Sequence, residues 1–195
     1  MKHVKMLGLL VMAAASLMAF ASSASAAPVL TSPSGTEYTG EIHATLEKGT
    51  SAVLKAGIED TCTESTAKGT VSVNNTAEAS GTLSALTFGS VATPCSQDTT
   101  TITPGKLTIK DTTNEVLTTG SRVEVKVTGL GITCFYGAET GSVKIGTLTG
   151  GTPAKLSVST TALQRETGSN TTFCALNGTW TGTYIVTTPS TLLTT

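Results

Sequence analysis

Histidine, aromatic and charged residues are scarce in this sequence, which has two histidines, one tryptophan and 13% charged side chains. Ser-His-Asp, Cys-His and most zinc centres require histidine. His3 lies in a segment that we expect to be removed, which leaves His43. Strand alternation places His43 with Glu41 and Thr45, opposite Ile42, as in a solvent-facing strand residue. No G-x-S-x-G, H-E-x-x-H or phosphate-loop motif occurs. We therefore expect no enzymatic activity, no metal and no cofactor.

Long apolar runs are confined to the N-terminus. Lys2 and Lys5 precede an uncharged run over residues 6–20, and the small residues Ala24-Ser25-Ala26 follow. This order is typical of a signal peptide, and the run is shorter than the roughly 20 residues of a membrane-spanning helix. We predict cleavage after Ala26, with a retained N-terminal anchor as the alternative. The mature protein is expected to be secreted or loosely associated with the cell envelope, without a transmembrane segment.

The mature chain has little net charge. Without Lys2 and Lys5 it keeps ten basic and thirteen acidic side chains, a net charge of about −3. Because no basic run is present to hold phosphates, nucleic acid is not an expected partner.

The four cysteines, Cys62, Cys95, Cys134 and Cys174, are widely spaced. An even number in an exported chain predicts two disulfide bonds, and the spacing does not fit a compact zinc site. Three pairings are open. We favour Cys62–Cys95 and Cys134–Cys174, which place one bond in each half of the chain.

Threonine, glycine, serine, alanine and valine dominate the rest of the chain, a composition that favours strands over helices. The clearest alternation is "SRVEVKVTG", in which Val123, Val125 and Val127 face one way. Other expected strands are 36–46, 51–57, 69–75, 82–88, 106–110, 142–148, 154–160 and 179–187. The sequence thus predicts an all-β fold of about ten short strands, a disulfide-stapled antiparallel β-sandwich, with closure into a barrel left open.

The mature chain is expected to form one β domain over residues 36–189. Residues 27–35 are polar and predicted to be a flexible lead, and residues 190–195 a frayed tail. Within the domain, "VLKAGIEDTC" (53–62) resembles "VKVTGLGITC" (125–134), which suggests a duplication but lacks a fixed period.

Trp180 lies in "FCALNGTWTGTYIVTTP" and shares a strand face with Gly182, Tyr184 and Val186. If this face is inward, Trp180 and Tyr184 are core residues near the bridge of Cys174. If it is outward, the two rings form a shelf for a ligand. We favour the core position, because a chain so poor in large apolar residues needs its tryptophan inside. Trp180 and Tyr184 remain the candidate ligand contacts.

One acidic group surrounds Cys62: Glu59, Asp60 and Glu64 in "GIEDTCTES". Such carboxylates can bind calcium or act as the paired acids of a glycosidase. There is no Asp-x-Asp ladder, and sugar clefts carry more aromatic residues than this chain has, so a solvated loop is the favoured interpretation.

Several segments together, "SAVLKAGIEDTCTES…KGTVSV", "GTLSALTF", "GLGITCFY…IGTLTGG" and "FCALNGTWTGTYIVTTP", resemble a family of small secreted, four-cysteine, Thr/Gly-rich β proteins from soil actinobacteria. The resemblance spans nearly the whole mature chain and implies a bacterial origin. The family is uncharacterised, so the resemblance assigns no residue a role.

These observations predict a non-enzymatic extracellular or cell-envelope protein that acts by binding or as a structural component. A second hypothesis is a carrier that holds a small apolar ligand between its sheets. A hydrolase that uses Glu59, Asp60 and Glu64 is the third.

Overall fold

The structure is a computed structural model that describes residues 27–127, 129–170 and 172–195. The predicted signal peptide, residues 1–26, lies outside the described residues. Fifteen strands are present: β1 (Leu30–Thr31), β2 (Gly40–Leu46), β3 (Ala52–Lys55), β4 (Glu59–Cys62), β5 (Ser65–Asn74), β6 (Glu78–Phe88), β7 (Asp98–Thr103), β8 (Lys106–Lys110), β9 (Glu115–Thr119), β10 (Arg122–Val127), β11 (Ile132–Gly137), β12 (Ser142–Thr149), β13 (Lys155–Arg165), β14 (Asn177–Thr188) and β15 (Leu193–Thr194). No helix in the described part of the chain is long and apolar enough to cross a membrane.

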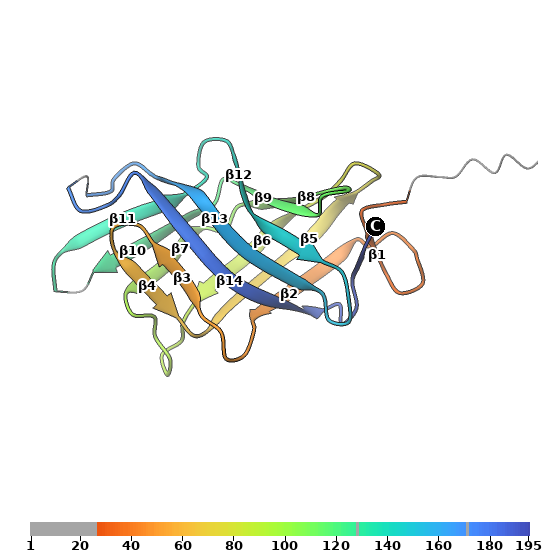
Figure 1. Cartoon of the computed structure of the whole chain (residues 1–195), viewed down its shortest axis with the longest axis horizontal. Helices are drawn as coiled ribbons and strands as arrows, with labels where there is room; N and C mark the ends of the chain where they lie inside the picture. The colour runs from red at the N-terminus through yellow and green to blue at the C-terminus, as the bar shows by residue number, and fades with distance from the viewer. Residues whose placement is uncertain (1–26, 128, 171) are drawn as a thin grey trace, which may run out of the picture.

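Eight strands close into an antiparallel barrel in the order β14-β2-β5-β6-β8-β9-β12-β13, because β13 also pairs with β14 (Figure 1). The other strands of the 13-stranded sheet continue strands of this ring; they are β3, β4, β7, β10 and β11. Along β14, β2 pairs with residues 184–188 and β3 with residues 179–181, so β2 and β3 act as one interrupted strand. Four further pairs of consecutive strands each form one interrupted long strand in the same way: β4 with β5, β7 with β8, β9 with β10, and β11 with β12. The chain is therefore an up-and-down meander of eight long strands.

The all-β, antiparallel, disulfide-stapled prediction is confirmed, and the sheet is closed rather than split into two layers. There are more strands than the ten or so expected, because six of the strands, β1, β4, β7, β9, β11 and β15, were not predicted. Both favoured disulfides, Cys62–Cys95 and Cys134–Cys174, are present.

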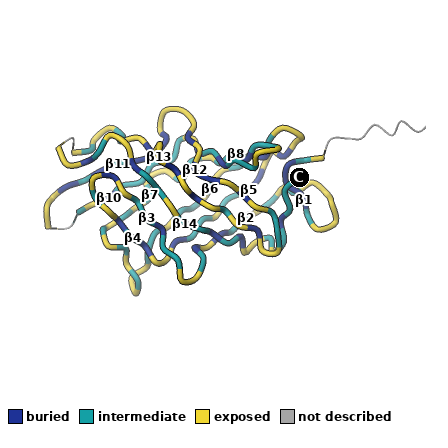
Figure 2. The backbone as a smooth tube through the Cα atoms, in the orientation of Figure 1, coloured by how far each residue is buried: buried dark blue, intermediate teal, exposed yellow. Residues whose placement is uncertain are grey.

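Burial alternates along the strands, as Figure 2 shows by the change between buried and exposed backbone. Val125 is buried, and Val123 and Val127 pack against the core, as their alternation predicts. Val73 does not follow Val71 inside and is 46% exposed. The β5–β6 register shifts between Val71 and Val73, and such a bulge turns the following side chain to the other face.

Bulges also bend the wall, and two of them depend on glycine. A Cβ on Gly81 would lie 2.2 Å from the carbonyl oxygen of Thr70, and one on Gly146 would lie 2.1 Å from that of Ser157. No side chain fits at such distances, so glycine at these two positions allows neighbouring strands to approach closely where the barrel curves.

The two halves of the barrel carry their disulfides at equivalent places. Cys62 lies in β4 and bonds to the loop between β6 and β7, while Cys134 lies in β11 and bonds to the loop between β13 and β14. In each half, then, the second long strand is tied to the loop between the third and fourth. The segments 53–62 and 125–134, similar in sequence, form equivalent hairpins.

Both termini of the domain pack into the barrel, which corrects the predictions of a flexible lead and a frayed tail. β1 pairs with β15, and Val29, Leu30 and Leu192 are completely buried. These apolar side chains cover the end of the barrel at which the C-terminus lies (Figure 1), called here the β1 end. Their burial outweighs the polar composition of residues 27–35 and 190–195.

Asn74 attaches β1 to the barrel. Its Oδ1 accepts a hydrogen bond from Leu30 N (3.1 Å), and its Nδ2 donates to the carbonyl oxygens of Leu30 (2.6 Å) and Tyr38 (2.9 Å). The Asn74 side chain is buried, and its hydrogen bonds give the three backbone groups partners that they would otherwise lack.

We expect Asn74→Ala to lower the free energy of unfolding by about 2–4 kcal/mol, because it leaves buried backbone groups of β1 without partners. Urea denaturation of the mature protein measures this loss. The control is Asn177→Ala, at an exposed strand position, which should change the stability by less than about 0.5 kcal/mol. Equal effects of the two variants would contradict the role given to Asn74.

Candidate ligand-binding site in the barrel interior

Two adjoining cavities of about 70 and 90 Å³ lie inside the barrel. They share five wall residues: Ala44, Ala67, Leu83, Leu107 and Leu156. The first extends toward β7, β11 and β14, and the second toward the β1 end, where Leu192 forms part of its wall. Since nearly all of the surface that lines them is apolar, these spaces suit an apolar molecule better than ordered water.

Trp180 belongs to the wall of the first cavity, and so does Tyr184, while Val186 lines the second. The face predicted to be inward is therefore inward. Trp180 makes edge-to-face contacts with Phe88 and Tyr184, each with ring centroids 6.1 Å apart. Its buried indole Nε1–H has no acceptor in hydrogen-bonding geometry among the described residues. Of the two alternatives, the inward core position is the one found, and the outward shelf is not. The inward position also brings both rings into contact with the cavity.

Tyr184 is 2% exposed, and its hydroxyl donates a hydrogen bond to Ser65 Oγ at 3.0 Å. Burial raises the pKa of Tyr184 to about 12, although interactions with the Ser65 and Trp180 side chains act in the opposite direction. Tyr184 is thus a neutral, apolar part of the cavity wall at ordinary pH, with its one polar group satisfied.

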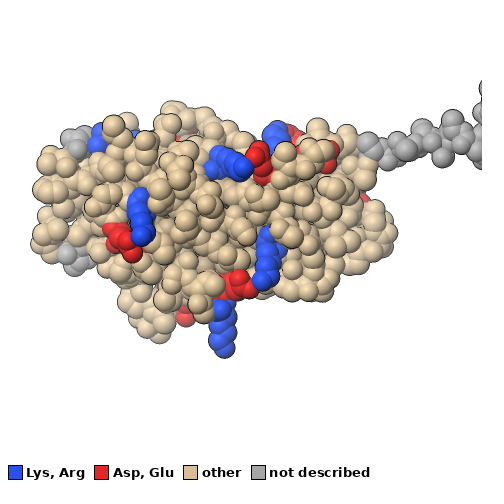
Figure 3. Space-filling model, in the orientation of Figure 1, with Lys and Arg blue, Asp and Glu red and all other residues tan. Residues whose placement is uncertain are grey.

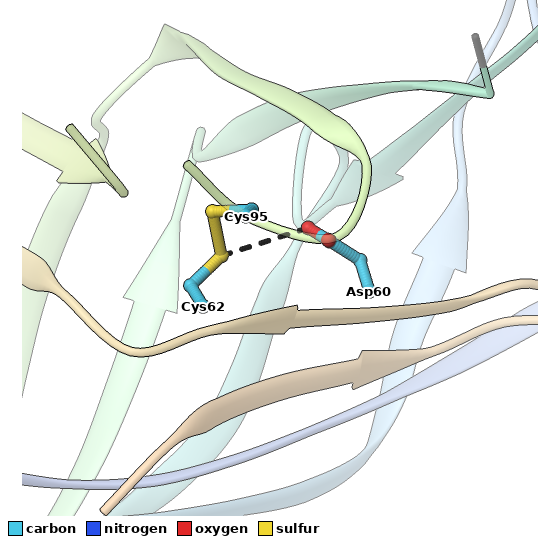
Figure 4. A group of neighbouring side chains, drawn as sticks. All are labelled: Asp60, Cys62 and Cys95. Atoms are coloured by element: carbon cyan, nitrogen blue, oxygen red, sulfur yellow. Dashed lines mark hydrogen bonds between the residues drawn. A yellow bond between two sulfur atoms is a disulfide. The ribbon is translucent and has the colours of Figure 1, made fainter. Parts of the chain in front are cut away.

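Asp60 lies beside the Cys62–Cys95 disulfide (Figure 4). It is 2% exposed. Its Oδ1 accepts hydrogen bonds from Ser96 Oγ (3.0 Å) and Gln97 N (2.7 Å), and its Oδ2 accepts one from Thr99 Oγ1. This carboxylate therefore joins β4 to the beginning of β7, two strands at opposite ends of the sheet order.

Asp60, Cys62 and Cys95 form the one group of three or more potential metal donors found in the described part of the chain. The Sγ of Cys62 lies 3.6 Å from Asp60 Oδ2. Both sulfurs belong to the disulfide, so Cys62 has no proton to donate and neither sulfur is a thiolate ligand. The arrangement supports a structural role for Asp60.

Glu59 and Glu64 do not join Asp60 in an acidic cluster. Glu59 is exposed and forms an ion pair with Lys55 at 2.9 Å. Glu64 is also exposed, and hydrogen bonds from Thr93 and Ser90 lower its pKa. One carboxylate is thus buried and committed to β7, while two face solvent, an arrangement without the paired acids that a glycosidase needs.

His43 is partly exposed, with its Nε2 3.7 Å from Glu41 Oε2. The two residues lie on the outer face of β2, as their alternation predicts. His43 therefore lies apart from both cavities.

Charged side chains lie mainly on the outer surface, where the face in Figure 3 shows scattered residues of both signs. Several are paired, for example Lys155 with Glu47 (2.6 Å) and Lys126 with Glu124 (3.0 Å). Such pairs leave the visible face without a broad basic area.

Part of the cavity wall was not predicted. Leu83, Leu86 and Phe88 all line the first cavity. In a regular strand Leu83 would face the side opposite to Leu86 and Phe88, because side chains alternate. The β5–β6 register shifts where Lys68 faces Ala85 and Gly69 faces Leu83. The extra residue, Ser84, restores Leu86 and Phe88 to the inner face.

Comparison with known proteins gave no match: no family model, no curated protein and no solved structure is similar to this chain. The assignment of a function therefore depends on the geometry of the barrel.

We expect the stability of the protein to decline between pH 10 and about 12. Tyr184 of the folded protein has a pKa of about 12, whereas an unfolded tyrosine ionises near pH 10. Stability present below pH 10 is therefore lost as ionisation favours the unfolded chain, by up to about 2–3 kcal/mol. Denaturant unfolding at several pH values measures the decline, which Tyr184→Phe should reduce. An equally steep decline in that variant would contradict the assignment.

Asp60→Ala should lower the free energy of unfolding by about 2–4 kcal/mol, because the Gln97 N–H and two hydroxyls lose their buried acceptor. Glu59→Ala, next in the chain but exposed, should cost less than about 0.5 kcal/mol. Thermal or urea unfolding compares the two variants. Similar losses would show that Asp60 does not hold β7.

Proposed function

We propose that the protein is exported and binds a small apolar molecule inside its barrel, without catalysis. The observation that carries the proposal is the pair of adjoining, apolar-walled cavities in the barrel interior. Eight-stranded barrels are just wide enough to be filled by side chains or to hold one small ligand. Here the inward positions include many small residues, such as Ala44 and Ala67, which leave the interior incompletely filled.

Export is part of the proposal. The N-terminal sequence has the order of a signal peptide, and two disulfides suit an oxidising compartment. A carrier outside the cytoplasm would bind apolar compounds that dissolve poorly in water.

The walls limit the ligand to an uncharged compound. Among the residues that line either cavity, Asp60 is the one carboxylate, and its oxygens accept hydrogen bonds from residues 96–99. An ionised ligand would leave its charge unpaired in an apolar space, at a cost of several kcal/mol.

The volume limits the ligand to a small one. A protein cavity of about 150 Å³ accommodates benzene, and the two cavities together are of this size. We therefore expect a compound of about six to ten non-hydrogen atoms. A larger one would require side chains at the shared wall, such as Leu83 and Leu156, to move. For so small a ligand we expect a Kd between about 10 μM and 1 mM.

A surface-binding or structural role is the second candidate. It is favoured by the large apolar side chains exposed at the end of the barrel opposite β1. Leu130 is 70% exposed, Leu176 69% and Phe173 56%. Single exposed apolar residues are common on protein surfaces, so the interior cavities carry more weight.

Toluene titration of the mature, disulfide-bonded protein tests the proposal. Trp180 is the only tryptophan of the chain and lines the first cavity, so its fluorescence should change with saturation. Two-dimensional NMR should show the accompanying shifts at the methyl groups of Leu107 and Leu156.

Ala67→Leu should weaken toluene binding at least about tenfold, because the added atoms occupy the junction of the two cavities. Ala77→Leu, in an exposed turn, should bind as the natural protein does. Binding that is absent from the natural protein, or equal in both variants, would overturn the proposal.

A further inference from the structure

Both ends of the barrel are closed, so the location of an entrance is a separate question. At the β1 end, Val29, Leu30 and Leu192 are completely buried and Leu192 contacts the second cavity. An apolar molecule could pass there only if β1 and β15 detached from the barrel.

The opposite end is closed by Tyr136 and a disulfide. Tyr136 is 1% exposed, and its hydroxyl lies 2.9 Å from the carbonyl oxygens of Ala56 and Ala175, between which it shares its proton. The Cys134–Cys174 bond fixes the loop between β13 and β14 over β11. These contacts join three separate segments across the end of the barrel.

The side wall has a long interruption between β6 and β7. β6 pairs with β8 over residues 78–82, and Leu83 N donates to the carbonyl oxygen of Gly105 (3.0 Å). Beyond this bond no strand pairing is present between residues 84–88 of β6 and residues 98–103 of β7. β7 pairs with β10 alone and forms one end of the sheet order. The other neighbouring long strands among the described residues are connected by ladders, although residues 142–145 of β12 have no pairing with β13.

This interruption, bounded by residues 84–88 and 98–103, is called the β6–β7 window. Its lower limit is the bond between Leu83 and Gly105. Its upper limit is Asp60 with Ser96 and Gln97, where β7 begins beside β4. Both limits are hydrogen-bonded, so the window is a bounded opening in the wall.

Phe88 lies at the edge of the window, with the first cavity behind it. It lines that cavity and contacts Trp180 edge to face. Phe88 and Thr99 also line an open cleft of about 510 Å³ on the outside, together with Val91, Pro94 and Cys95. The same two residues thus separate the outer cleft from the interior.

We propose that apolar ligands enter and leave the barrel sideways through the β6–β7 window, with Phe88 as its gate. The inference rests on the proposed function for the ligand, and on the geometry of the wall for the route. Rotation of one phenyl ring joins the outer cleft to the first cavity, whereas passage through either barrel end requires several segments to separate.

The loop over residues 89–97 forms the outer rim of the window, and it is held to residues 60–64 by hydrogen bonds, among them those of Ser96 and Gln97 to Asp60, and by one disulfide. Cys95 is bonded to Cys62, Gly89 N donates to Glu64 O (2.7 Å), and Ser96 N donates to Thr61 O (2.9 Å). Ser90 and Thr93 also donate to the Glu64 carboxylate. The disulfide is the one covalent tether of this loop within the described residues, so its loss should loosen the rim around Cys95 and widen the window, which makes ligand exchange sensitive to reduction.

Acrylamide quenching of Trp180 fluorescence tests the window without any ligand. Phe88→Ala should raise the quenching constant about threefold or more, because local opening then gives the quencher access to the indole. Phe173→Ala, an exposed aromatic position outside both cavities, should leave it unchanged. Far-ultraviolet circular dichroism verifies that each variant keeps its strand content.

The two disulfides provide a matched pair of variants. Cys62→Ser with Cys95→Ser should raise the toluene association and dissociation rates by similar factors, about fivefold or more, with Kd changed less than about twofold. Cys134→Ser with Cys174→Ser, the equivalent bond in the other half, should change both rates by less than about twofold, because the Tyr136 hydrogen bonds to Ala56 and Ala175 still close that end. Phe88→Ala retains both bonds and serves the rate measurement if a double variant fails to fold.

The outcomes separate the two proposals. If toluene exchange or acrylamide quenching becomes faster only in the Cys134/Cys174 variant, the ligand enters through the barrel end and not through the window. An unchanged quenching constant in Phe88→Ala would exclude the window. If toluene does not bind but Phe88→Ala increases quenching, the window exists and the proposed function fails.

Discussion

Pairing of β14 with β2 and β3 is the constraint on which the rest of the structure depends. β2 and β3 form the first long strand of the meander and β14 is the last, while β14 also pairs with its chain neighbour β13. The contact joins the beginning of the domain to its end and removes two free sheet edges. It also creates an interior, because an open sheet of the same strands would expose the face that carries Trp180, Tyr184 and Val186. The cavities exist because the sheet is closed around inward residues that are mostly small.

The disulfides act where hydrogen bonding is weakest. β4 and β7 form the two ends of the sheet order, and they meet through Asp60 and the Cys62–Cys95 bond instead of a ladder. The Cys134–Cys174 bond fixes a long loop over the end of the barrel. Each bond closes a loop of 30 to 40 residues, worth on the order of 3–4 kcal/mol in the chain-entropy model. The two disulfides lie at equivalent places in the two halves, so the sequence similarity between residues 53–62 and 125–134 corresponds to a structural similarity.

Local features of this fold could be predicted from the sequence, and long-range ones could not. The alternation of Val123, Val125 and Val127, and of Trp180 and Tyr184, identifies the inner face because side chains on a strand alternate strictly. The ends of the chain were misjudged, because the burial of Leu30 and Leu192 depends on an opening created by distant strands. Asp60 likewise looks like a solvated loop residue until β7 is placed against β4. Phe88 could not be assigned to the cavity, because its face depends on a bulge that leaves no clear signal in the sequence.

The central claim is that the barrel encloses a dry, apolar space able to hold a small molecule. A crystal of the mature protein exposed to xenon under pressure tests this claim most directly, because xenon binds in empty apolar cavities. The account predicts xenon density between Leu83, Leu107 and Leu156, where the two cavities adjoin. An interior without xenon, with side chains collapsed into the space or ordered water filling it, would contradict the account.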